Sequence, residues 1–162
     1  PSTSRFFNDP SAPQTSSPHE MQRYLSKISG PLLDRIDIHI EVTPVPFEKL
    51  SDDRKAESSV DIRQRVTAAR ELQSQRFAFL ENIHYNAQMN TKHIREFCAL
   101  DDASKELLKT AMERLNLSAR AYDRILKVSR TIADLEASPN VMASHIAEAI
   151  QYRSLDREGW LG

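Results

Sequence analysis

The stretch Ser29-Gly-Pro-Leu-Leu-Asp-Arg-Ile-Asp-Ile-His-Ile-Glu-Val42 decides how the chain is divided, because it joins a turn, a charged residue and the clearest strand pattern in the sequence. Apolar and polar residues alternate from Ile36 to Val42, and this period of two predicts a half-buried β-strand. Gly30-Pro31 ends any preceding helix, because proline disfavours helical backbone at the residue before it and has no amide hydrogen. Arg35 therefore lies where the backbone changes direction, just before the strand.

Two segments with different composition precede this stretch. Residues 1–17 are rich in proline, serine and threonine, which predicts a loop or partly disordered segment. Ser17-Pro18-His19-Glu20 has the pattern of a helix start, and apolar residues at helical spacing extend the predicted helix to Ser29. With the strand and a charged loop after it, these segments make a first predicted unit, residues 1–57.

The second predicted unit, residues 58–162, is helical. Ser58 caps a long helix that reaches about Leu80, and a short helix runs through Ile94 and Phe97. Asp101 or Asp102 caps the next helix, and Ser118 caps the one after it. Each helix has apolar residues at helical spacing; they include Ile62, Val66, Ala69 and Leu72, then Leu107, Leu108 and Met112, then Tyr122, Ile125, Val128, Ile132 and Leu135, and finally Val141, Ile146, Ala149 and Ile150. The predicted fold is mainly α, with a strand followed by a helical bundle.

Composition limits the functional classes. The chain has 162 residues, 40% of them hydrophobic, and a net charge of −1, so it can form a core but has no overall positive field for a polyanion. No apolar run has the length of a membrane span and no signal-peptide pattern opens the chain, so we expect a cytoplasmic protein without membrane contact. The single cysteine, Cys98, excludes an internal disulfide and is expected to be a small buried residue.

The sequence has no motif of a self-contained enzyme. Its three glycines cannot form a phosphate loop of the Gly-x-x-x-x-Gly-Lys-Ser/Thr type. The five histidines are scattered, and no serine has the flanking glycines of a nucleophile elbow. If the chain takes part in ATP hydrolysis, the phosphate cradle must come from elsewhere.

The segment Leu117-Ser-Ala-Arg-Ala-Tyr-Asp-Arg-Ile-Leu-Lys127 has an unusual charge pattern. Arg120 falls in the first turn after the Ser118 cap, and Arg124 and Lys127 follow on the same side of the helix. A helix start normally favours acidic residues, because its free N–H groups are partially positive. A bound phosphate would reverse this preference. From the residues alone, a surface arginine paired with an acid is at least as well supported as an arginine that binds phosphate.

Several motifs resemble one family. Leu-Leu-Asp-Arg-Ile-Asp, ending at Asp37, resembles the arginine-finger segment in the magnesium-chelatase and replicative-helicase branch of the AAA+ ATPases, and the whole phrase is similar to the ComM/YifB family. Leu-Ser-x-Arg-Ala at 117–121 is similar to the sensor-2 segment of this branch, and the resemblance runs from about Met21 to Arg157. It implies a C-terminal fragment, the end of an α/β core followed by a helical lid.

The resemblance also implies roles. Arg35 becomes the finger candidate, acting on the nucleotide of the neighbouring subunit, and Arg120 the sensor-2 candidate, with Arg124 as the weaker one. ATP and Mg²⁺ are implied for the full-length protein, together with a homo-oligomeric ring and DNA remodelling such as branch migration in natural transformation. The Walker motifs belong to the upstream region, so the fragment alone is expected to be inactive and to hold no tightly bound cofactor.

The chain departs from the family near its N-terminus. There the family often has a Cys-Pro-Cys arrangement, and this chain has serines and threonines, at 2–4 and 15–17. Without the soft thiolate ligands we predict no zinc site. Resemblance to chelatase subunits does not establish magnesium insertion into a porphyrin.

An alternative function belongs to a different class: a helical nucleic-acid-binding or protein-interaction module that does not depend on nucleotide. Its contact surface would be the arginines of the helix at 58–80, namely Arg63, Arg65, Arg70 and Arg76. Interleaved acids such as Asp61 and Glu71 favour a solvated helix face instead. Salt-dependent DNA binding by this fragment alone would support the alternative.

Overall fold

The structure is a computed structural model that describes residue 32 and the ranges 35–40 and 57–153. Within these residues the chain forms five α-helices and one short 3₁₀ helix, so the prediction of a mainly helical fold is confirmed. The helix expected at 17–29 and the N-terminal segment lie outside the described residues. None of the described helices has the length and apolar character needed to cross a bilayer. The elements are α4 (Ser59–Arg76), η1 (Asn86–Gln88), α5 (Thr91–Phe97), α6 (Asp102–Arg114), α7 (Ala119–Leu135) and α8 (Ala143–Gln151).

Three of the helices begin where capping residues predict. The Ser58 hydroxyl oxygen accepts from the Asp61 amide at 3.2 Å, and the Ser118 oxygen accepts from the Ala121 amide at the same distance. Of the two aspartates considered for α6, Asp101 is the cap, and its carboxylate accepts from the Ser104 amide at 2.7 Å. Each cap satisfies a backbone N–H that has no partner within its helix.

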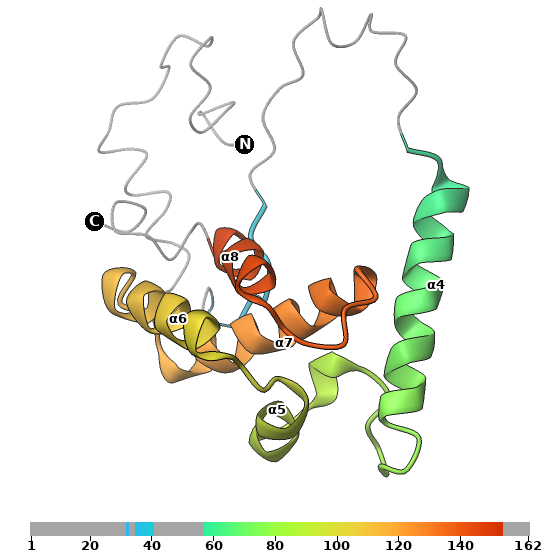
Figure 1. The fold of residues 1–162 in the computed structure, drawn as a ribbon, viewed down its shortest axis with the longest axis horizontal. Coiled ribbons are helices and arrows are strands. Elements are labelled where there is room, and N and C mark those ends of the chain that lie inside the picture. Colours follow the sequence, from blue (N-terminus) through green and yellow to red (C-terminus); the bar gives the residue numbers. More distant parts are fainter. Residues whose placement is uncertain (1–31, 33–34, 41–56, 154–162) are drawn as a thin grey trace, which may run out of the picture.

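Helix α7 is the centre of the bundle. In Figure 1 it runs through the middle, with α8 above it, α5 below it and α4 standing at one side. Eight of its residues are buried, and they are mostly apolar or small. Helices α4, α5 and α8 all contact α7, and α6 contacts α8. The core includes Phe77, Met89, Ile94, Leu108, Ile125, Leu126 and Ile146.

Cys98 lies in this core and is buried, as expected for a small apolar residue. Burial raises the pKa of its thiol to about 12. The thiolate is the reactive form of cysteine, so this side chain is chemically inert at neutral pH.

Helix α4 is shorter than predicted and only half packed. It ends at Arg76 instead of Leu80, and the Phe77 ring turns into the core to meet the Phe97 ring edge-to-face at 5.6 Å. In its first half Ile62 and Val66 remain exposed, and burial begins at Ala69. The apolar stripe is therefore present in the sequence, but in the structure its first two members are exposed and its burial begins at Ala69.

The strand predicted at 36–42 is not formed over its described part, 36–40. The alternation predicted a buried isoleucine face, whereas Ile36, Ile38 and Ile40 are 40%, 45% and 72% exposed and His39 between them is buried. A strand needs a neighbouring strand to bond its backbone groups. No described residues supply one; instead the His39 amide donates to the Tyr152 carbonyl at 2.7 Å. Residues 41 and 42 lie outside the described part.

The last helix also starts later than expected. Val141 was assigned to it, but α8 begins at Ala143, and Val141 forms an isolated parallel bridge with Leu100. This bridge ties the loop after α7 to the loop before α6. Val141 is buried because of this contact and not because of a helical stripe.

Candidate functional site

The N-terminus of α7 presents Arg120 to solvent. Arg120 is in the first turn, two residues after the Ser118 cap, and the first turn contains no acidic residue. Among the described residues its side chain has no hydrogen-bond or ion-pair partner. An arginine that only forms a surface ion pair would have an acidic partner, and the described residues supply none to Arg120. Its guanidinium and the free N–H groups of the first turn therefore lie at the same end of the helix without a paired acid.

Arg124 lies one turn further along α7 and is engaged differently. Its guanidinium pairs with the carboxylate of Asp37, two residues after Arg35. The Arg124 side chain is 27% exposed and that of Asp37 is 50% exposed. The structure thus joins the two sequence motifs, because the helix that carries Arg120 also holds the segment that carries Arg35.

Residues 35–40, here called the finger segment after the role that the resemblance implies for Arg35, contact the bundle on α7 and just after α8. Besides the Arg124 contact on α7, the Arg153 guanidinium donates to the Ile36 carbonyl and the His39 amide to the Tyr152 carbonyl, both just after α8. The backbone of Arg35 donates to the Leu32 carbonyl at 3.0 Å. The Arg35 side chain is exposed and pairs with none of the described residues.

A pocket of about 330 Å³ lies between the finger segment and the bundle. Its walls are largely apolar, with Ile38 and Ile40 on one side and residues of α7 such as Val128 and Ile132 on the other. Lys127 and Glu148 also border it. Ile38 and Ile40 therefore do not pack closely against α7 along the whole segment.

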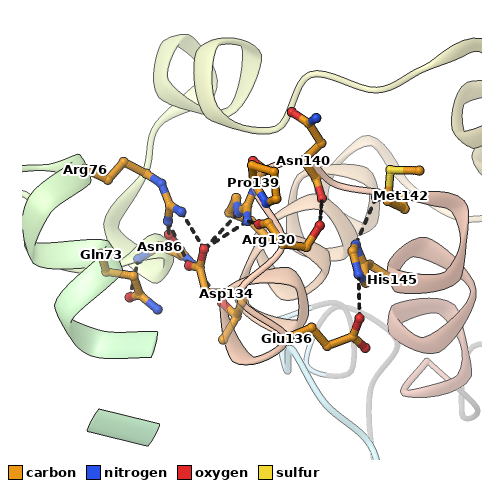
Figure 2. A network of polar contacts seen from close by, with 12 residues as sticks. Gln73, Arg76, Asn86, Arg130, Asp134, Glu136, Pro139, Asn140, Met142 and His145 are labelled. Carbon is orange, nitrogen blue, oxygen red and sulfur yellow. Dashed lines mark hydrogen bonds and ion pairs between the residues drawn. The ribbon is translucent and has the colours of Figure 1, made fainter. Parts of the chain in front are cut away.

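A buried polar network fixes α4 to α7, and sequence reasoning missed it. The Asp134 side chain, fully buried, lies between Arg76 of α4 and Arg130 of its own helix (Figure 2). Asn86 of η1 donates to Asp134 at 2.8 Å and accepts from Arg76 at 2.9 Å. Arg130 also donates to the carbonyls of Ser138 and Pro139. Arg76 was expected to lie on a solvated face; it is mostly buried because this carboxylate faces it.

The electrostatics of the network favour the charged form of Asp134. Burial alone would raise the pKa of Asp134, but hydrogen bonds from Arg76 and Asn86 and the charges of two arginines lower it below its usual value. Burial lowers the pKa of Arg130, and the Asp134 charge opposes this effect. The only hint in the sequence is the four-residue spacing of Arg130 and Asp134, which puts them on one helix face.

A second polar contact ends α7 and starts α8. The His145 ring accepts from the Met142 amide at 2.9 Å through Nδ1, and its Nε2 lies 3.0 Å from a Glu136 carboxylate oxygen (Figure 2). This buried histidine closes the turn between two helices. No group of three or more histidine, cysteine or acidic side chains in the described ranges is placed to hold a metal ion.

Comparison with known proteins identifies the family. Residues 56–153 match the family model of the C-terminal part of magnesium chelatase, subunit ChlI, and residues 1–50 match the model of magnesium chelatase, subunit ChlI. The chain belongs to the magnesium chelatase ChlI family. Both motifs that carry Arg35 and Arg120 fall within these matched ranges.

Curated relatives of this ChlI-family chain are much longer. It is 42% identical to "Competence protein ComM" of Haemophilus influenzae over 142 residues, which are 87% of this chain and 27% of that protein. It is 41% identical to "Uncharacterized protein YifB" of Escherichia coli K12, over 86% of this chain and 27% of the relative. A third relative, "Uncharacterized protein Rv2897c" of Mycobacterium tuberculosis, is 34% identical over 82% of the chain. The chain spans about a quarter of the length of these relatives.

Proposed function

We propose that this chain is the C-terminal lid part of a magnesium-chelatase-like AAA+ ATPase that couples ATP hydrolysis to DNA remodelling. In this proposal Arg120 responds to the nucleotide bound by its own subunit, and Arg35 completes the site of the neighbouring subunit in a homo-oligomeric ring. Family membership supports the ATPase class. The observation that carries the proposal is the exposed Arg120 at a capped helix start, with no acidic partner among the described residues.

The Arg120 site fits the phosphates of ATP. A guanidinium can make two parallel hydrogen bonds to phosphate oxygens, and the free N–H groups of the first helical turn favour the same negative charge. The buried network holds the C-terminal end of α7 to α4. If bound phosphate displaced Arg120, α7 would therefore move as one rigid helix. Bound ATP with Mg²⁺ supplies the phosphoryl group that is transferred to water. Within 35–40 and 57–153 no group of three or more histidine, cysteine or acidic side chains is placed to hold a metal ion, so the proposal names no Mg²⁺ ligand among these residues.

The alternative of a nucleotide-independent binding module has less support. Of the four arginines on α4, Arg76 is taken up by the Asp134 network and Arg65 pairs with Glu57 at 2.7 Å. Arg70 stacks over the Tyr85 ring, 4.2 Å from its centroid. Most of the arginines that would form the contact surface therefore already have partners within the chain.

Nucleotide binding by the full-length protein tests the role of Arg120. We expect Arg120→Ala to weaken ATP binding by about 10- to 100-fold, the range for losing a hydrogen bond to a charged group. A fluorescent nucleotide titration measures this, and Arg120→Lys, which keeps the charge but not the two-pronged geometry, should lie between. Unchanged affinity and turnover in Arg120→Ala, with both impaired in Arg124→Ala, would transfer the sensor role to Arg124.

A further inference from the structure

The finger segment is held against the bundle in an unusual way. Its isoleucines are substantially exposed, and a pocket separates two of them from α7. The isoleucines thus pack only partly against the bundle, and the one buried side chain among residues 35–40 is that of His39. The described contacts that fix the segment are polar: two backbone groups bond residues after α8, and Asp37 pairs with Arg124 on α7.

The Arg124–Asp37 pair differs from the two other contacts. It joins two charged side chains, and it connects the segment to α7 and not to the end of α8. Arg124 is four residues from Arg120, so both lie on one side of the same rigid helix. Asp37 is two residues from Arg35. The ion pair is therefore a short physical path between the two arginines that we propose act on nucleotide.

We propose that the Arg124–Asp37 ion pair is a positioning link that sets the place of Arg35 according to the position of α7. This inference rests on the proposed function and deepens it. When α7 shifts in response to nucleotide at Arg120, the link carries the finger segment with it, so that Arg35 reaches the neighbouring site only in one lid position. Arg124 then acts through Asp37 and does not contact phosphate.

A partly exposed pair has the right strength for this task. Such pairs add little to the stability of a fold, because water and salt screen them. They still favour one geometry over others by a few-fold. A link of this strength biases the position of the segment and adds little to stability, whereas losing one partner of the buried Arg76–Asp134 contact would leave uncompensated charge in the core.

Steady-state ATP hydrolysis by the full-length protein tests the link. We expect Arg124→Ala and Asp37→Ala each to lower kcat about fivefold, the scale of a partly exposed ion pair, with less than a twofold change in KM. The double alanine variant should be no worse than either single variant, since both remove the same interaction. The reversed pair, Asp37→Arg with Arg124→Asp, should return kcat to within about twofold. Arg65→Ala, which breaks the exposed pair with Glu57 on α4, is the matched control and should leave kcat unchanged.

Four results would overturn the proposal. Normal kcat in Asp37→Ala would show that the pair does not matter. A raised KM in Arg124→Ala alone would mean that Arg124 contacts nucleotide. Additive losses in the double variant, or no recovery in the reversed pair, would mean that the two residues act separately.

Amide hydrogen exchange separates a failure of the link from a failure of the proposed function. In the 162-residue chain, without ATP, we expect Arg124→Ala to speed exchange at the His39 amide about fivefold, and the Arg65→Ala control to leave it unchanged. Unchanged exchange at His39 would reject the link itself. Faster exchange together with normal hydrolysis in full-length Arg35→Ala would instead reject the finger role, and the catalytic meaning of the link with it.

Discussion

Two arginine–aspartate contacts in this molecule have the same chemistry and different surroundings. Asp134 is fully buried between Arg76 and Arg130, and it joins α4 to α7 inside the bundle. Asp37 is half exposed and joins the finger segment to α7 at the surface. Removing Asp134 would leave the buried Arg130 and the mostly buried Arg76 without their carboxylate, whereas without Asp37 the Arg124 side chain, 27% exposed, would still be accessible to water. From this difference in burial we infer that the Asp134 contacts stabilise the fold, whereas the Asp37 contact sets the position of the finger segment.

The comparison extends to arginines without a described partner. Arg35 and Arg120 are exposed, and neither forms an ion pair with a described acid. Substituting them should change the chemistry of the full-length protein and leave its folding intact. Substituting the buried arginines or Asp134 should do the reverse. The following predictions test this division, from the largest expected effect to the smallest.

Loss of Arg35, the proposed finger arginine, should have the largest effect. A finger arginine stabilises charge on the transferred phosphoryl group and contributes about 10³- to 10⁵-fold in rate in other phosphoryl-transfer systems. If the full-length protein hydrolyses ATP as proposed, we expect Arg35→Ala to lower its kcat by at least about 10³-fold, with nucleotide affinity and melting temperature nearly unchanged. Arg95→Ala, which removes another exposed arginine, is the control and should hydrolyse ATP normally.

Loss of the buried carboxylate should have the largest effect on stability. We expect Asp134→Ala to lower the free energy of unfolding of the chain by about 3–5 kcal/mol, because breaking a buried pair leaves uncompensated charge. Urea denaturation followed by circular dichroism measures this. Glu57→Ala, which breaks the exposed pair with Arg65, should leave the midpoint nearly unchanged. Equal midpoints for the two variants would remove the distinction between the buried and exposed pairs.

The depressed pKa of Asp134 predicts how this stabilisation depends on pH. A carboxyl whose folded pKa is lowered stabilises the fold above its unfolded pKa, about 3.9, and the stabilisation is lost as pH falls through the folded value. The wild type should exceed Asp134→Asn in unfolding free energy by a constant amount between about pH 5, which is roughly one unit above that unfolded pKa, and about pH 7. The difference should shrink below about pH 4. A gap that persists undiminished toward pH 2 would show that charge is not its source.

The cap of α7 should have the smallest effect. The Ser118 oxygen satisfies one amide of the first turn, and replacing such a cap by alanine costs about 1 kcal/mol. We expect Ser118→Ala to lower the urea midpoint slightly, and Ser118→Asn, which keeps an acceptor, to retain most of the stability. A loss as large as that of Asp134→Ala would place the cap among the essential contacts of the fold.

The sequence predicted elements that depend on neighbours along the chain. Ser58 and Ser118 identified helix starts because a cap bonds an amide only three residues away. The partners Arg76 and Asp134 are 58 residues apart, so no local pattern shows that they meet. The strand at 36–42 was predicted from alternation alone, but a strand also needs a neighbour, and the described residues give Ile36–Ile40 none. The motifs located Arg35 and Arg120, whereas the Asp37 contact that connects their elements required the fold.

Subunit mixing tests the central claim, that Arg35 acts on the site of a neighbour, most directly. Full-length Arg35→Ala subunits are mixed with subunits that lack the lysine of the upstream phosphate loop, each inactive alone, and ring assembly is verified for every mixture. A mixed ring can pair an intact phosphate loop on one subunit with an intact Arg35 on the next, so we predict that ATP hydrolysis returns and is greatest near equal proportions. Mixed rings that assemble and stay inactive at every ratio would contradict action between subunits.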